Sequence, residues 1–201
     1  MIRKPQNWES VQLPSDRKKI PAGAYVVRIK KAAVQNNGYG DQLCLLFDIT
    51  EGDYAGYYGS EFSANTMTDK KWKGVLRVFL PVDDGSEKDE WTKRTFKGMV
   101  TAFEKSNPGY VFNWDEATLV GKTVGVLFRN EEWDYNGKTG WTAKPFRAIS
   151  ADSVREGAYT LPKDKPLADK SASGFGTAGF CGFPGTANSF AEVDNDDELP
   201  F

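Results

Sequence analysis

Apolar and polar residues alternate along two early stretches of the chain, residues 23–34 and 42–51, which is the period of a β-strand with one buried face. The segment between them, Asn36-Asn-Gly-Tyr-Gly-Asp41, is rich in turn-forming residues, so the two stretches are expected to form a hairpin with Tyr39 at its tip. Residues 57–64 and 74–80 are predicted as the third and fourth strands. Residues 122–131 and 141–149 are predicted as the last two, joined by a loop around residues 135–137.

The period changes to that of an amphipathic helix between Ser86 and Lys105, where apolar residues recur at spacings of three and four. Ser86 and Asp89 are placed to cap its start, and Asn107-Pro-Gly109 ends it. The order favours a mainly β, OB-fold-like protein, a five-stranded Greek-key barrel with one helix between strands 3 and 4, in which residues 74–80 are an added or split strand. An open α+β sandwich fits the same order.

Composition divides the chain into four parts. Residues 1–22 have no clear periodicity and are interpreted as an irregular arm in which Trp8 and Val11 could staple onto the body, and residues 23–160 are long enough for one domain. Residues 161–191 form a Gly-, Ser- and Phe-rich linker, and residues 192–201 form an acidic tip. We expect these last two parts to be a disordered tail, because a run of acids with few apolar neighbours cannot bury enough surface to fold.

The net charge of −2 conceals a division of charge between the body and the tail. The first 170 residues contain all 26 basic residues and 23 of the 28 acidic ones, a net charge of +3, whereas the last 31 residues carry five acids and no base. The closing Leu-Pro-Phe adds an apolar anchor, a restricted backbone and a terminal carboxylate to this acidic run. A partner protein could therefore bind the tip.

The tip resembles that of bacterial single-stranded DNA-binding proteins, which end in an Asp-rich sequence closed by Pro-Phe. The matching or neighbouring residues are Asp194, Asp196, Asp197, Glu198, Leu199, Pro200 and Phe201, of which Glu198 and Leu199 stand where that family usually has Asp and Ile. The resemblance implies that the tip recruits replication, recombination and repair proteins and competes with DNA for the body. Residues 96–110 and 121–128 are similar to phage-encoded proteins of the same class, which implies a phage or prophage origin.

A body that binds single-stranded DNA needs aromatic rings interleaved with Lys and Arg on one surface. The residues that offer this are Trp72, Lys71, Lys73, Arg77, Tyr57, Tyr58, Arg28, Lys30, Tyr39, Trp133, Tyr135, Lys138 and Trp141. Trp72, which stands among lysines, is the strongest single candidate. The alternative is that the rings cap a barrel core and that the cations are solvated surface charges.

Composition also limits the chemistry. The chain has no histidine, which removes the commonest general base and zinc ligand, and Cys44 and Cys181 lie in different contexts, so neither a disulfide nor a cofactor is expected. No apolar run is long enough to span a membrane and no secretion signal is recognisable, so a cytoplasmic location is expected, that of the bacterial host if the protein is phage-encoded.

These features together predict a non-catalytic protein that binds single-stranded DNA with little sequence preference. A strand-annealing or recombination-mediator protein is the first alternative, and a metal-dependent nuclease using Asp83, Asp84 and Glu87 is a remote one. The sequence leaves the oligomeric state open, a homodimer or higher oligomer included.

Overall fold

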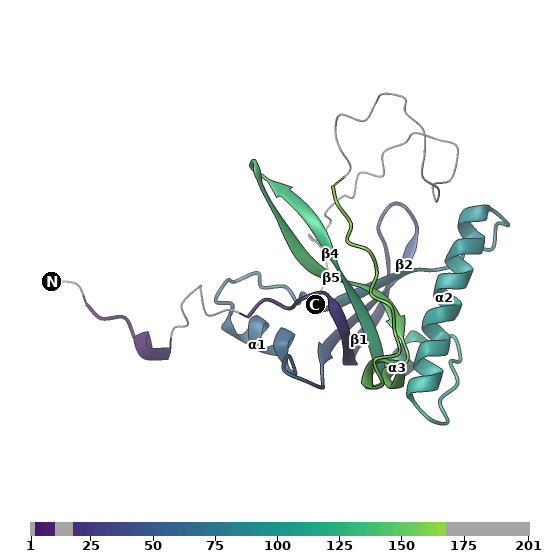
Figure 1. Ribbon diagram of the computed structural model, residues 1–201, viewed down its shortest axis with the longest axis horizontal. Coiled ribbons are helices and arrows are strands. Elements are labelled where there is room, and N and C mark those ends of the chain that lie inside the picture. Colours follow the sequence, from purple (N-terminus) through teal and green to yellow (C-terminus); the bar gives the residue numbers. More distant parts are fainter. Residues whose placement is uncertain (1–2, 11–17, 168–201) are drawn as a thin grey trace.

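A five-stranded antiparallel sheet with the strand order β3-β2-β1-β4-β5 forms the centre of the protein. The computed structural model describes residues 3–10 and 18–167 (Figure 1). The strands are β1 (Gly23–Asn36), β2 (Asp41–Ile49), β3 (Val75–Phe79), β4 (Thr123–Tyr135) and β5 (Lys138–Ile149). The helices are α1 (Tyr57–Ala64), α2 (Glu87–Ser106) and α3 (Ala151–Arg155), with 3-10 turns η1 (Trp8–Ser10) and η3 (Glu116–Leu119). The mainly β class and the helix between β3 and β4 are confirmed.

The hydrophobic core lies between one face of the sheet and α2, and we call the opposite face of the sheet the outer face. The core combines alternate residues of the strands with the apolar side of the helix, including Val27, Ile29, Leu43, Leu45, Phe47, Phe128, Phe96, Met99 and Phe103. The side-chain amide of Asn107 donates to the carbonyls of Phe103 and Thr123 at 2.8 Å each, which ties the end of α2 to the start of β4.

The predicted start of α2 is confirmed at Ser86, whose hydroxyl accepts from the Asp89 backbone N–H at 3.1 Å. The Asp89 side chain does not cap the helix but binds the segment that precedes it. Its carboxylate accepts from the backbone N–H groups of Val82 and Asp83 and pairs with Lys93 at 2.8 Å. The Lys93 ammonium and these two N–H groups hold the pKa of the Asp89 carboxyl at about 2.

The prediction of a third strand at residues 57–64 is wrong, because this segment is the helix α1. Gly56 turns the chain with φ 72°, a conformation that favours glycine. The Asp48 carboxylate, from the end of β2, then accepts from the backbone N–H groups of Tyr58 and Gly59 at 3.1 Å each. A carboxylate from outside the segment thus caps this helix, so the local sequence carried no capping signal.

Strands β4 and β5 extend beyond the rest of the sheet as a two-stranded projection (Figure 1), and we call residues 129–144 the distal hairpin. Strand β1 pairs with β4 only as far as Phe128, which leaves the adjoining edge of β4 open to another segment. Lys165 pairs with that edge through its backbone. Its N–H donates to the Asn130 backbone carbonyl at 2.8 Å, and its carbonyl accepts from the Glu132 backbone N–H at 2.9 Å. Part of the segment predicted as linker therefore contacts the body.

Strand β2 is buried on both faces. On the outer face, Cys44 and Leu46 form a small cluster with Val75, and Trp72 packs against it. Helix α3, which the sequence did not predict, lies against β4 at Gly125, where an added Cβ would stand 2.5 Å from a Val154 methyl carbon. Within the described segments, no helix is long and apolar enough to cross a membrane.

Candidate nucleic-acid interface

Exposed cations gather on the outer face of the sheet because of the strand register. Arg28 lies opposite Asp48, Lys31 opposite Leu46, and Arg77 opposite Cys44, and paired residues share a face. Arg147 reaches the same face through its pairing with Leu127. We call Arg28, Lys30, Lys31, Arg77 and Arg147 the outer cationic face, and all five are exposed.

The buried side chains Cys44 and Leu46 of β2 lie between Lys31 on β1 and Arg77 on β3. Cys44 and Leu46 are only 1% and 6% exposed, and Trp72 packs against the cluster that they form with Val75. Burial raises the pKa of the Cys44 thiol, and the adjacent Arg77 guanidinium partly opposes that shift. Long basic side chains can cover apolar surface with their stems while the charged ends stay in water. The Lys30 ammonium lies 3.9 Å from the Asp48 carboxylate, so a phosphate would share or replace that contact.

One of these cations, Lys31, was missed by sequence reasoning. A register shift in β1 between Ile29 and Lys31 breaks the simple alternation, so Lys31 lies opposite Leu46, whereas alternation from Arg28 singled out only Lys30. Arg147 follows a similar irregularity in β5, where the partners step from Arg147 to Pro145. Bulges of this kind have no clear signal in a single sequence.

Trp72 is half-buried and held at the border of the outer cationic face. Its indole N–H donates to the Phe47 carbonyl at 2.9 Å, and its ring lies 5.5 Å from that of Phe62. The Lys30 ammonium lies 5.3 Å from the centre of the Trp72 ring. A base that stacks there must displace this cation, so the role of Trp72 as a stacking platform stays a prediction. The neighbouring Lys71 and Lys73 are exposed.

Tyr58 is not available for stacking, and its prediction as a binding residue is wrong. The side chain is 5% exposed and lies edge-on to Phe47 in the core, with ring centres 5.5 Å apart. Burial raises the pKa of its phenol well above the ordinary value. Tyr57 is half-buried and packs edge-on against Tyr54 and Tyr58, so most of its surface is also committed to the fold.

One side of the distal hairpin continues the outer face. By alternation along β4, Trp133 and Tyr135 lie on the side of Leu127, and the partners Gly140 and Lys138 lie on that side too. The Trp133 indole lies across Gly140, where an added Cβ would stand 2.6 Å from the ring. Trp133 is 40% exposed and Tyr135 is 72% exposed, so this side offers two accessible rings beside Lys138.

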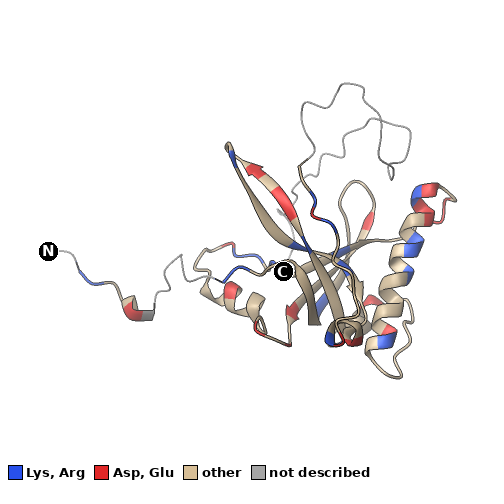
Figure 2. Ribbon diagram, in the orientation of Figure 1, with Lys and Arg blue, Asp and Glu red and all other residues tan. Residues whose placement is uncertain are grey.

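Trp141 lies on the other side of the hairpin. It is 48% exposed and pairs with Glu132, and alternation places Asp134 on the same side. Figure 2 shows acidic positions along the hairpin strands and a basic position at the tip. The structure therefore separates the two predicted tryptophans, Trp133 toward the outer face and Trp141 toward an acidic surface that would repel phosphate.

Cations also lie at the base of the hairpin on the Trp133 side. Arg129 and Lys144 are paired residues, and both interact with Glu131, at 2.7 Å and 3.6 Å. The Arg129 guanidinium lies 4.3 Å from the centre of the Phe146 ring. These contacts hold the guanidinium in place beside the outer cationic face.

Tyr39, the remaining predicted residue, lies in the β1–β2 loop and is 48% exposed. This loop and the distal hairpin lie beyond opposite ends of β1, which spans 14 residues or roughly 45 Å along the strand at about 3.3 Å per residue. The predicted residues therefore do not form one cluster. Tyr39, the outer cationic face and Trp133 follow one another along the sheet, whereas Tyr58 lies in the core and Trp141 lies on the other side of the distal hairpin.

Two of the three acids proposed for the nuclease alternative, Asp83 and Asp84, have structural contacts. Asp83 pairs with Lys93, and the Asp84 carboxylate accepts from the Ser86 N–H at 2.9 Å. Across residues 3–10 and 18–167, no three His, Cys, Asp or Glu side chains are grouped closely enough to hold a metal ion.

The tip residues Asp194, Asp196, Asp197, Glu198, Leu199, Pro200 and Phe201 lie outside the described residues, as do Val11, Cys181 and the linker from residue 168. No protein-family model matches the chain, and no curated protein matches its sequence.

Proposed function

We propose that this protein binds single-stranded DNA without catalysis, along the outer cationic face and the Trp133 side of the distal hairpin. The observation that carries the proposal is the strand register, which gathers five exposed cations on the face opposite α2 and aligns them with accessible rings. Phosphate contacts supply affinity without regard to sequence, and stacking adds about 1 to 3 kcal/mol per base on any base.

We further infer that the sheet is of the OB type. Three features support this: β1 pairs with both β2 and β4, α2 connects β3 to β4, and Cα atoms of β3 and β5 approach within 8 Å. In OB folds the β2–β3 face and the β1–β2 and β4–β5 loops bind oligonucleotides. Here those regions contain Arg77, Tyr39 and Trp133, which agrees with the proposed path.

The acidic tip is proposed to recruit replication, recombination or repair proteins, as the resemblance of Asp196 to Phe201 to bacterial tips implies. A protein with this pair of functions would protect single-stranded intermediates in phage DNA replication inside a bacterial cytoplasm. The aromatic end and the carboxylates of the acidic tip would bind a partner site that combines an apolar pocket with basic residues.

Fluorescence anisotropy with the full-length protein tests the proposal. A labelled thymidine oligonucleotide and a duplex of the same length are titrated at several salt concentrations. We expect strong, salt-dependent binding of the single strand and much weaker binding of the duplex, since duplexed bases have no free faces. Equal affinity for the two would refute it. Adding the complementary strand distinguishes simple binding from annealing, which would accelerate duplex formation.

A further inference from the structure

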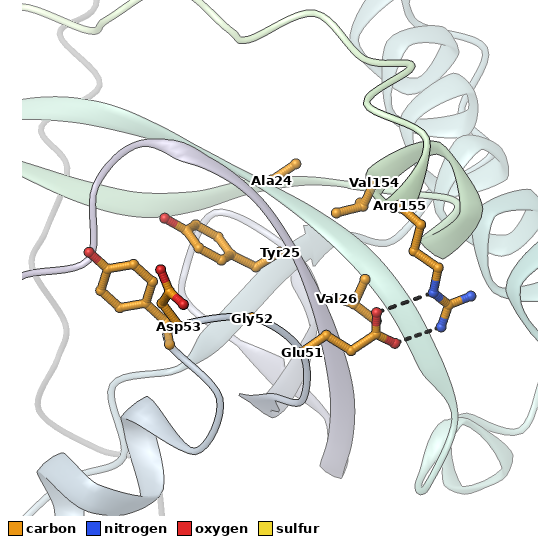
Figure 3. A pocket seen from close by; sticks show the side chains of 9 residues that line it. Ala24, Tyr25, Val26, Glu51, Gly52, Asp53, Val154 and Arg155 are labelled. Atoms are coloured by element: carbon orange, nitrogen blue, oxygen red, sulfur yellow. Dashed lines mark hydrogen bonds and ion pairs between the residues drawn. The ribbon is translucent and has the colours of Figure 1, made fainter.

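A pocket of about 330 Å³ opens between the start of β1, the loop after β2 and helix α3 (Figure 3). One wall is aromatic, formed by Tyr25 and Tyr54, whose rings meet edge-on with centres 5.8 Å apart. The other wall contains Ala24 and Val154. A volume at the lower end of the range for ligand pockets suits one large side chain better than a cofactor.

The rim of this pocket is acidic. Glu51 and Asp53 both line it, and the cation of its lining, Arg155, pairs with Glu51 at 2.7 Å (Figure 3). Arg155 also pairs with Asp152 at 2.8 Å. A cationic or aromatic group is therefore favoured at this site, whereas DNA and the acidic tip are disfavoured.

The N-terminal arm has the complementary chemistry. Residues 1–22 contain five basic and two acidic residues, a net charge of +3. The arm carries Trp8 on the short turn η1, and this side chain is 57% exposed. The root of the arm is fixed, because the Tyr25 hydroxyl donates to the Pro21 carbonyl at 2.9 Å and Ile20 packs on the core. None of residues 3–10 lines the pocket of its own chain.

We propose that the N-terminal arm of one copy docks on a second copy, with Trp8 in the pocket between Tyr54 and Val154 and the basic arm residues facing Glu51 and Asp53. Tryptophan and arginine are the side chains that most often dominate such contacts, because they bury large apolar area and satisfy charges at the rim. The attraction between a +3 arm and an acidic rim weakens as salt increases. Reciprocal docking of two arms gives a closed dimer.

Sedimentation velocity of the full-length protein without DNA tests this inference. At low salt we expect the mass to rise with concentration from 22.3 kDa toward twice that value, and to return to the monomer in high salt. Trp8→Ala and Asp53→Lys should each give a monomer. Trp91→Ala is the matched control, because Trp91 is 56% exposed and lies on α2, and this variant should associate like the wild type.

Mixing the two monomeric variants separates docking between copies from docking within one chain. Trp8→Ala keeps an intact pocket and Asp53→Lys keeps an intact arm, so their mixture should form a heterodimer through one contact. A wild-type protein that stays monomeric at every concentration would overturn the proposal, as would a Trp8→Ala variant that still dimerises. Association is measured without DNA and DNA binding is measured in a separate titration, so failure here leaves the proposed function standing.

Discussion

Removal of two cations from the outer cationic face should reduce both the affinity for single-stranded DNA and its salt dependence. We choose Arg28→Gln with Arg77→Gln, because these side chains are exposed on β1 and β3, on either side of β2, and glutamine retains much of their length and polarity. Each phosphate contact on a single strand contributes about 0.7 to the slope of log affinity against log salt. The double variant should therefore lose about 1.4 from that slope.

The same slope gives the loss of affinity at each salt concentration. Two lost contacts correspond to about 25-fold weaker binding at 0.1 M salt and about 5-fold at 0.3 M, since the difference scales with the logarithm of salt concentration. Anisotropy titrations at four or more salt concentrations measure both quantities. The control is Lys97→Gln with Lys105→Gln, two exposed positions on α2 beyond the core. Equal slopes for the two double variants would show that phosphate does not lie on the outer face.

Three further predictions come from the described contacts, and a fourth concerns the acidic tip. Trp133→Ala should weaken single-strand binding by about 5- to 150-fold, the loss of one stacked base, and Trp141→Ala should change it little in the same anisotropy assay. Tyr58→Phe should leave DNA affinity unchanged, whereas Tyr58→Ala should lower the free energy of unfolding in urea by about 3 kcal/mol or more, because the ring is buried. Because the pKa of Asp89 is lowered in the folded protein, its carboxylate stabilises the folded state. This contribution is complete above about pH 4 and is lost as the pH falls toward 2. Asp89→Asn should remove that part of the pH dependence of the thermal unfolding temperature. Deletion of residues 194–201 should leave DNA binding equal or tighter and abolish capture of partner proteins, and weaker DNA binding by the truncated protein would contradict the competition between tip and DNA.

Most of the fold could be predicted because its signals are local. Alternation identified β1 and β2, and the change of period together with Ser86 identified α2 and its first turn. Helix α1 was not predicted, because the signal that forms it is not local. Its cap is the carboxylate of Asp48, eight residues before Gly56, and the aromatic residues at its start have the composition of a strand. A tertiary contact therefore determines that this segment is a helix and not a strand.

The types of residue in the candidate site could be predicted from the sequence, but their positions relative to one another could not. The sequence identified aromatic and basic residues, yet burial of Tyr58 and the inclusion of Lys31 depend on packing and on a bulge in β1. The separation of Trp133 from Trp141 depends on the hairpin register, which places Gly140 under one ring and Glu132 opposite the other. A one-residue change of register would exchange their sides.

The path of the DNA is the central claim, and photocrosslinking tests it most directly. Single-stranded DNA containing 5-iododeoxyuridine is irradiated with the full-length protein, and crosslinked peptides are identified by mass spectrometry. We predict crosslinks at Trp133 and Tyr135 and at Tyr39, and none at Trp91 or Trp114, although these two are 56% and 79% exposed. Crosslinks concentrated at Trp91 and Trp114, with none on the distal hairpin, would contradict the account.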